Sequence, residues 1–222
     1  MKIIQWLIAI LFSILWCILA LIYMHIRGKE KNFEELKKFK EIFKLEHLIF
    51  ILAGTALGLF LFWKTGDKGK DVVSCYKNML TFFWLLPIGF IDYKEKIIPN
   101  KIILGGIAYW IIYFFAECFI NDISIKSIAK YSLAGFVFGA GVLLISALII
   151  RGGVGMGDVK LFAVIGMLYG FNGVFTILFM TLLLLFLVCI FLLVLKKVDR
   201  KSTFPMAPFV TIGFAISVVM GI

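Results

Sequence analysis

The sequence predicts an all-α, polytopic membrane protein, a helical bundle with about eight transmembrane helices. Two observations predict this fold: 63% of the 222 residues are hydrophobic, and they gather in long runs separated by short basic segments. Soluble domains are close to half apolar, whereas a spanning helix needs roughly 20 mostly apolar residues. Little length remains outside the runs, so we expect a single membrane-embedded domain over residues 1–222.

The apolar runs define eight candidate spans. The first run is longer than the roughly 7–15 residues of a signal-peptide core, and no small-residue cleavage site follows it, so we expect a retained helix. The sixth span is short for a crossing helix, which indicates that it is tilted, buried among its neighbours, or begins inside the membrane. The expected spans are 3–24, 46–63, 72–91, 102–120, 128–150, 159–171, 174–195 and 204–222.

The segment 25–45 between the first two spans is basic and amphipathic. Phe33, Leu36, Phe39 and Phe43 recur at steps of three or four residues among lysines and glutamates, a helical period. We expect a loop that lies along the membrane interface, with its apolar face toward the lipid. A solvated connector is the alternative interpretation.

Most of the 23 basic residues lie in four segments: 25–45, 92–101, 151–160 and 196–203. If eight spans alternate, these segments share one side of the membrane, and the positive-inside rule makes that side cytoplasmic. Topology and anionic lipid then account for the net charge of +10. The charge therefore predicts a lipid bilayer rather than nucleic acid as the partner.

The four cysteines, Cys17, Cys75, Cys118 and Cys189, are far apart and form no C-x-x-C pair. Single thiols in apolar helices usually serve as small packing residues. A metal site or a disulfide framework would require grouped cysteines. We therefore expect no metal and no cofactor.

Two aspartates stand at predicted span ends: Asp92, and Asp158 in Gly155-Met156-Gly157-Asp158. The spans 102–120 and 128–150 lie between them, and two crossings return the chain to its starting face. We therefore expect both carboxyl groups at the cytoplasmic side and at similar depth. Carboxylates at membrane depth are costly, and interior pairs tend to be functional.

A carboxyl pair of this kind suits aspartyl proteolysis. One carboxylate acts as a general base on a water, and the protonated partner donates to the scissile carbonyl. Gly153, Gly155 and Gly157 expose backbone beside Asp158, where an extended substrate segment would lie. The alternative is ordinary capping, because an aspartate at a helix start accepts hydrogen bonds from free backbone N–H groups.

These residues resemble the type IV prepilin peptidases, membrane aspartyl proteases of the GxGD class. Asp92 followed by Ile98-Pro99-Asn100 is similar to the first family motif, Gly153 to Lys160 (GVGMGDVK) to the second, and Phe204 to Phe209 (FPMAPF) to the third. The three motifs occur in the expected order and cover residues from about 85 to 222.

The resemblance implies that Asp92 and Asp158 are the catalytic pair and that Pro205 and Pro208 help to shape the substrate site. It also implies prepilin or pseudopilin precursors as substrates, cleaved after a short basic leader, typically behind a glycine, at the cytoplasmic face of a prokaryotic plasma membrane. Many relatives carry a longer, cysteine-containing segment after the first helix and methylate the product. The segment 25–45 contains no cysteine, so we expect a peptidase without methyltransferase activity.

Three alternatives stay open from the residues. A presenilin-like enzyme is also a GxGD protease, but its first aspartate lies deep within a span. A transporter or channel would use the aspartate pair as a proton relay, with glycine-broken spans at its centre. The third is an inactive scaffold for pilus assembly. Cleavage of a leader-bearing precursor in membranes distinguishes them.

Overall fold

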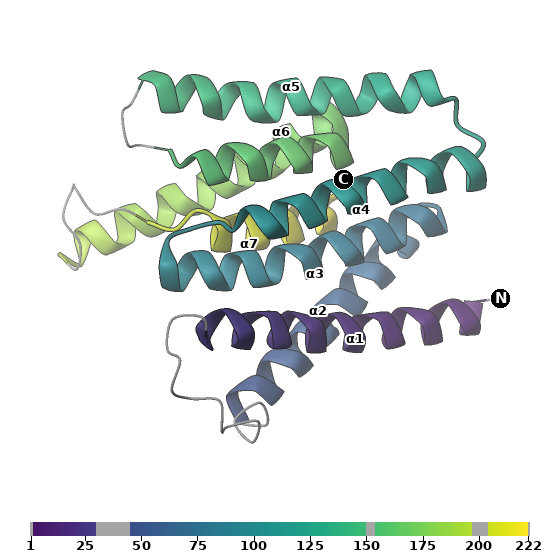
Figure 1. Cartoon of the computed structure of the whole chain (residues 1–222), viewed down its shortest axis with the longest axis horizontal. Helices are drawn as coiled ribbons and strands as arrows, with labels where there is room; N and C mark the ends of the chain where they lie inside the picture. Colours follow the sequence, from purple (N-terminus) through teal and green to yellow (C-terminus); the bar gives the residue numbers. More distant parts are fainter. Residues whose placement is uncertain (1, 30–44, 150–153, 197–203, 222) are drawn as a thin grey trace. The chain divides into compact units, whose positions relative to one another are not determined.

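The computed structural model describes residues 2–29, 45–149, 154–196 and 204–221, which form seven helices and no strand (Figure 1). The prediction of a helical chain is therefore confirmed for these residues. Segment 30–44 lies outside them, and so does most of the expected amphipathic loop at 25–45. The helices are α1 (Lys2–Lys29), α2 (Leu45–Asp67), α3 (Val72–Glu95), α4 (Asn100–Ile120), α5 (Ile125–Ile149), α6 (Met156–Val194) and α7 (Ala207–Met220).

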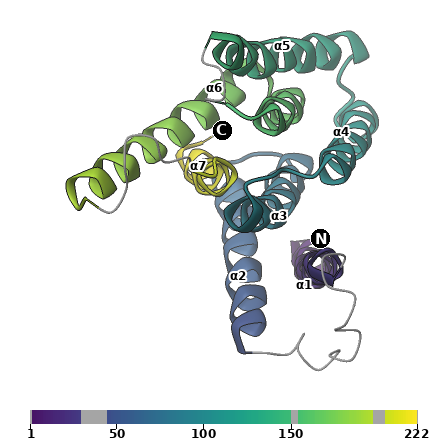
Figure 2. The same ribbon diagram turned by 60° about the vertical axis from the view of Figure 1, so that its left-hand side comes forward.

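The expected count of eight spans differs from the structure at α6. The sixth and seventh predicted spans, 159–171 and 174–195, belong to one element, and only Gly170 within it departs from helical geometry, with φ 62° and ψ −170°. This backbone region is open almost only to glycine. The ribbon changes direction sharply within α6 (Figures 1 and 2). One glycine thus replaces the expected inter-span loop.

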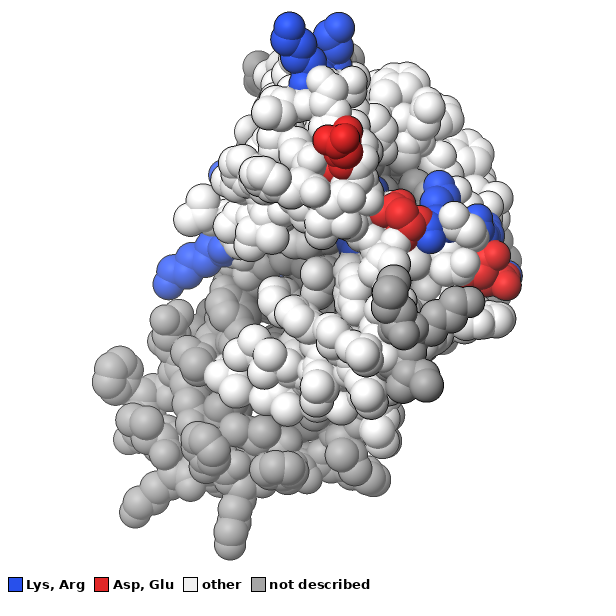
Figure 3. Space-filling model, turned by 90° about the vertical axis from the view of Figure 1, so that its right-hand side faces the viewer, with Lys and Arg blue, Asp and Glu red and all other residues white. Residues whose placement is uncertain are grey.

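Three helices in the described ranges, α4, α5 and α6, are long and apolar enough to cross a membrane. Many large apolar side chains of these helices are exposed: Phe119 is 83% exposed and Leu148 is 73% exposed. On the described part of the face in Figure 3, charged side chains form a few separate groups among uncharged side chains. A helical membrane protein explains this surface, because lipid tails solvate such side chains.

The chain divides into two compact units, Met1–Pro87 and Ile88–Ile222. The boundary falls inside α3, at a proline that removes one helical N–H group. Each unit is described by itself below. The expectation of a single domain over residues 1–222 stays a prediction.

In the unit Met1–Pro87, small and polar residues join the helices. A side chain at Gly58 of α2 would collide with the Phe83 ring of α3, whose nearest atom lies 2.2 Å from the position of an added Cβ. Asn78 donates its side-chain N–H to the Thr65 hydroxyl at 3.1 Å, and both residues are buried. Such pairing removes the cost of burying polar groups.

In the unit Ile88–Ile222, a glycine seam joins α5 to the first half of α6. A Cβ on Gly135 would fall 2.0 Å from the carbonyl oxygen of Gly166, and one on Gly139 would fall 2.5 Å from that of Phe162. Small residues let membrane helices approach to backbone contact. The seam therefore fixes the half of α6 that begins beside Asp158.

Tyr131 of α5 covers the bend in α6. Its ring fills the space in which a side chain at Gly170 would lie, and its hydroxyl donates to the carbonyl of Tyr169. A buried carbonyl beside a helix break is costly if it is left unpaired. Tyr131 thus compensates for the break at Gly170.

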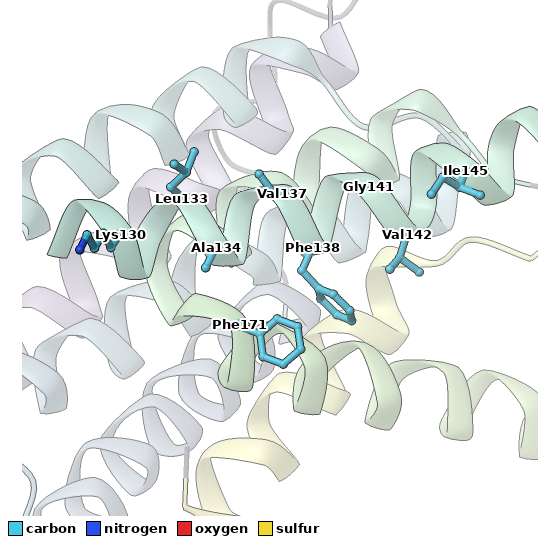
Figure 4. Close-up of a pocket in the computed structure, with 9 residues that line it drawn as sticks. All are labelled: Lys130, Leu133, Ala134, Val137, Phe138, Gly141, Val142, Ile145 and Phe171. Atoms are coloured by element: carbon cyan, nitrogen blue, oxygen red, sulfur yellow. The ribbon is translucent and has the colours of Figure 1, made fainter. Parts of the chain in front are cut away.

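The opposite face of α5 carries a shallow apolar groove of about 630 Å³ (Figure 4). Phe138 and Phe171 meet along one edge of the groove, with ring centroids 4.7 Å apart. Neither Asp92 nor Asp158 contributes to it, so the groove is separate from the carboxyl pair. It is lined by Lys130, Leu133, Ala134, Val137, Phe138, Gly141, Val142, Ile145 and Phe171.

Candidate active site

Asp92 lies in the last turn of α3 and is only 5% exposed. The helix ends just beyond it, where Lys96 adopts φ 53° and donates its N–H to the Asp92 carbonyl at 2.8 Å. A carboxylate near a helix C-terminus is disfavoured by the helix dipole, and burial adds a desolvation cost. Its ionised form therefore requires donors from elsewhere in the fold.

The first turn of α7 supplies these donors. The backbone N–H of Ala207 donates to Oδ2 of Asp92 at 2.9 Å, and the N–H of Met206 also bonds to this carboxylate. The first N–H groups of a helix have no partner within the helix and carry its positive dipole end. Asp92 thus connects the end of α3 to the start of α7.

Asp158 lies in the first turn of α6, three residues after the N-cap residue Gly155. The carboxylate accepts a hydrogen bond from the Gly155 N–H, and the Asp158 N–H donates to the Gly155 carbonyl at 3.0 Å. This is one half of a capping box, in which the third residue reaches back to the N-cap N–H, because Gly155 has no side chain to form the other half. The capping alternative is therefore part of the observed geometry.

Capping occupies only part of the Asp158 carboxyl group. Its Oδ1 atom is buried and has no hydrogen-bond partner among the described residues. An unsatisfied buried oxygen costs about 1–3 kcal/mol, and such an exception in a folded protein calls for an explanation. A donor such as water would satisfy an ionised Oδ1, and an acceptor would satisfy it only when Oδ1 carries a proton.

The two carboxyl groups are close enough to interact electrostatically. Both belong to the unit Ile88–Ile222, although they come from different helices. Neighbouring carboxyl groups do not both ionise freely, so such a pair tends to hold one proton between them.

One known protein family matches the part of the sequence that contains both carboxyl groups. The sequence model of the type IV leader peptidase family matches residues 79–195, more than half of the chain. The chain belongs to the type IV leader peptidase family. The matched range includes both Asp92 and Asp158 and ends before α7. No curated protein and no solved structure matches the chain.

In this leader peptidase chain, the predicted glycines differ in their surroundings. Gly155 is exposed, and a Cβ there would lie 3.1 Å from Oδ2 of Asp158. Gly157 instead packs against Ile98, whose Cβ would be 3.0 Å from an added Cβ. Gly153 lies outside the described residues. Only Gly155 is thus seen to keep space beside a carboxyl group.

The two predicted prolines both lie at the start of α7. Pro205 is half-buried just before the helix, and Pro208 is its second residue. Proline in a first helical turn loses no helical hydrogen bond. Pro208 leaves the Ala207 N–H free for Asp92, and its own Cα lies against α3 beside Gly89. These prolines therefore adjoin the helix end that holds Asp92.

Sequence reasoning missed two contacts around this site. Gly89 lies three residues before Asp92, just as Gly155 lies three residues before Asp158, and this shared spacing was an available signal. Lys160 in the first turn of α6 donates to the Asn100 side-chain oxygen at 2.9 Å. That bond joins the first and second motifs, which the linear sequence keeps far apart.

The described residues form no cluster of metal-binding side chains. Among the described residues, no group of three His, Cys, Asp or Glu side chains comes together as a metal ion would require. The expectations that the protein uses no metal and no cofactor stay predictions.

Proposed function

We propose that this protein is an aspartic endopeptidase of the prokaryotic plasma membrane in which Asp92 and Asp158 form the catalytic pair. It removes the short basic leader from type IV prepilin or pseudopilin precursors at the cytoplasmic face, cleaving after a glycine. Membership of the type IV leader peptidase family supports the reaction class. The positions of the two carboxyl groups support the mechanism.

One observation carries the proposal. Asp92 and Asp158 come from different helices yet interact electrostatically, and Oδ1 of Asp158 is buried without a described partner. A purely structural carboxylate pair would be expected to satisfy its buried oxygens. An oxygen that is left open beside a second carboxyl group suits a substrate carbonyl.

The pair performs hydrolysis by moving protons. One carboxylate takes a proton from water while the water oxygen attacks the scissile carbonyl carbon, and the protonated carboxyl donates to the carbonyl oxygen. The tetrahedral intermediate then collapses. The C–N bond breaks as the nitrogen takes the proton that the first carboxylate gained from water, and a hydroxyl of the intermediate returns a proton to the second carboxylate. Both carboxyl groups return to their starting state, with one proton between them.

The predicted substrate-binding residues border this pair. In this proposal Gly153, Gly155 and Gly157 bind the extended backbone of the cleavage segment. Pro205 and Pro208 form the wall of the substrate site beside Asp92. The exposed backbone at Gly155 supports the first assignment. The bend at Gly170 also lets α6 supply two membrane crossings, which would restore the alternating topology with the basic segments on the cytoplasmic side.

A cleavage assay with matched variants tests the proposal. Membranes containing the protein are incubated with a precursor that bears a basic leader, glycine and phenylalanine, and product is measured over time. We expect a loss of activity of about 10³-fold or more in each of three variants, Asp92→Asn, Asp158→Asn and the double variant. The two single losses should not add up in the double variant, because residues that act as one unit are not additive. Rates should fall at both low and high pH, because the pair works with one proton.

Asp122→Asn is the matched control. Asp122 is exposed, with φ 51°, a conformation that asparagine readily adopts. Full activity is expected from it. If either catalytic-pair variant keeps wild-type cleavage, the two-carboxylate mechanism is wrong. A wild-type protein that moves protons across vesicles and leaves the precursor intact would instead favour the proton-relay alternative.

A further inference from the structure

The two aspartates are held by unequal sets of donors. Asp92 receives backbone hydrogen bonds from two residues at the start of α7, the N-cap residue Met206 and Ala207. Asp158 receives one such bond, from Gly155, while its Oδ1 has no partner among the described residues. Hydrogen bonds donated to a carboxylate favour the ionised form, whereas an open oxygen can carry the proton and then act as a donor. The geometry therefore distinguishes the members of the pair.

Close contact at Gly89 allows the donors of α7 to reach Asp92. A Cβ on Gly89 would lie 3.0 Å from Oγ1 of Thr211, 3.3 Å from Cα of Pro208 and 3.5 Å from the carbonyl oxygen of Ala207. These three atoms all belong to the first turns of α7. Two of them are backbone atoms, which cannot rotate away. Gly89 is also one helical turn before Asp92 on α3.

We propose that Gly89 is a positioning residue: its missing side chain lets the first turn of α7 rest on α3, so that Asp92 is held ionised and Asp158 carries the shared proton on Oδ1. This inference rests on the proposed function. Asp92 is then the general base that takes the proton from water. Asp158 is the acid that donates from Oδ1 to the scissile carbonyl.

The charged side chains that neighbour Asp92 in sequence are Lys94, Glu95 and Lys96, at and just beyond the end of α3. The residues of α7 include no charged side chain. From α6, Asp158 itself faces Asp92, and the only cation in the first turns, Lys160, donates to Asn100. On α3, the Lys94 ammonium lies 4.3 Å from the centre of the Phe90 ring. The backbone N–H groups of α7 are thus the donors seen on the Asp92 carboxylate.

An infrared titration tests the assignment without depending on cleavage. The C=O absorption of protonated carboxyl groups is followed against pH in purified Asp158→Asn, where Asp92 remains, and in Asp92→Asn, where Asp158 remains; the double variant supplies the baseline. We expect Asp92 to titrate at a lower pH than Asp158. The reverse order would overturn the assignment, whether or not the wild type cleaves precursors.

A second titration tests the positioning role. Gly89→Ala in the Asp158→Asn background is expected to move the Asp92 midpoint up by about half a pH unit, because its donors are pushed away. Gly105→Ala is the matched control, since Gly105 lies in α4 and a Cβ there meets nothing within 4 Å. It should leave the midpoint unchanged. In the active protein, Gly89→Ala should shift the acidic limb of the cleavage profile by the same amount.

If Gly89→Ala is not recovered folded, the double variant with Thr211→Ala replaces it. That change removes the nearest obstructing atom and leaves the two backbone contacts. A smaller midpoint shift of the same sign is expected. Unchanged midpoints in the folded variant would overturn the positioning role. Loss of cleavage at all pH values with unmoved limbs would also overturn it, while leaving the proposed function intact.

Discussion

The two helix ends that present Asp92 and Asp158 are built in different ways. Asp158 is held by its own helix, because its carboxylate bonds to the N–H of Gly155 only three residues earlier. Asp92 stands at the unfavourable end of its helix, and its donors come from α7, over a hundred residues later in the chain. One carboxyl group is placed by local structure and the other by tertiary packing.

This difference indicates where the site is robust and where it is fragile. The bond from the Gly155 N–H lies within the first turn of α6, so Asp158 keeps its orientation if α6 moves as a body. Asp92 keeps its donors only while α3 and α7 stay in contact. We therefore expect packing changes to affect the pairing of the two groups before they affect the capping of Asp158.

The strongest test moves the helix of Asp158 without touching its cap. In Gly166→Ala, the new Cβ would lie 2.1 Å from the Gly135 carbonyl oxygen, so the two backbones must separate. Overpacking of this kind costs about 1–3 kcal/mol. We expect a lower temperature of half-unfolding in detergent and a large loss of cleavage, because Asp158 moves away from Asp92.

Gly141→Ala is the matched control on α5, where an added Cβ meets nothing within 4 Å. Replacing a helical glycine by alanine there should stabilise the protein by about 0.5–1 kcal/mol or leave it unchanged. Equal thermal stability of Gly166→Ala and Gly141→Ala would contradict the glycine seam. Full cleavage by a destabilised Gly166→Ala would contradict the need for a fixed pair.

Much of the helical architecture could be predicted from the sequence, because apolar runs of spanning length leave few alternatives in a membrane. The spans predicted at 159–171 and 174–195 put the division of α6 close to Gly170, but the form of that division could not be predicted from the runs alone. Hydropathy stays high on both sides of Gly170, and the bend depends on a positive φ covered by Tyr131 of another helix. A break of one residue leaves no polar loop for hydropathy to detect.

The candidate site, too, could be predicted from the sequence only in part. Counting spans predicted that Asp92 and Asp158 approach one another, and the glycines before Asp158 indicated a capped helix start. The dependence of Asp92 on the N–H of Ala207 could not be predicted, since backbone donors carry no residue-type signal. The spacing of Gly89 before Asp92 was visible in the sequence, but a glycine inside an apolar run does not identify the element that packs against it.

An intermediate effect on cleavage is expected when a methyl group is added at Gly155, beside the Asp158 carboxylate. Gly155 has φ −74° and ψ 142°, which alanine adopts without strain, but a Cβ there would lie 3.1 Å from Oδ2 of Asp158. We expect Gly155→Ala to lower the cleavage rate about tenfold, or about 1.4 kcal/mol in the barrier, with little change in thermal stability. The infrared midpoint of Asp92 in the Asp158→Asn background should not move.

That last measurement separates the two helix ends. Gly89→Ala is expected to change Asp92 through α7, whereas Gly155→Ala acts on Asp158 alone. If Gly155→Ala shifts the Asp92 midpoint as much as Gly89→Ala does, the two helix ends are not independent. Gly105→Ala again serves as the control for a glycine-to-alanine change with open space around it.

The smallest effect is expected at the bond between Lys160 and Asn100. Both residues are exposed, and the lysine ammonium donates to the amide oxygen at 2.9 Å, so solvent replaces the bond readily. Lys160→Met and Asn100→Ala should each cost less than about 1 kcal/mol of stability, with cleavage lowered about twofold through a looser start of α6. Their double variant should cost less stability than the sum of the two single variants, because contacting residues are coupled.

Lys126→Met changes an exposed lysine on α5 and is the control for the loss of charge alone. A loss of cleavage in Lys160→Met comparable with Asp158→Asn would show that Lys160 takes part in the chemistry, and the local cap would then be insufficient to prepare Asp158.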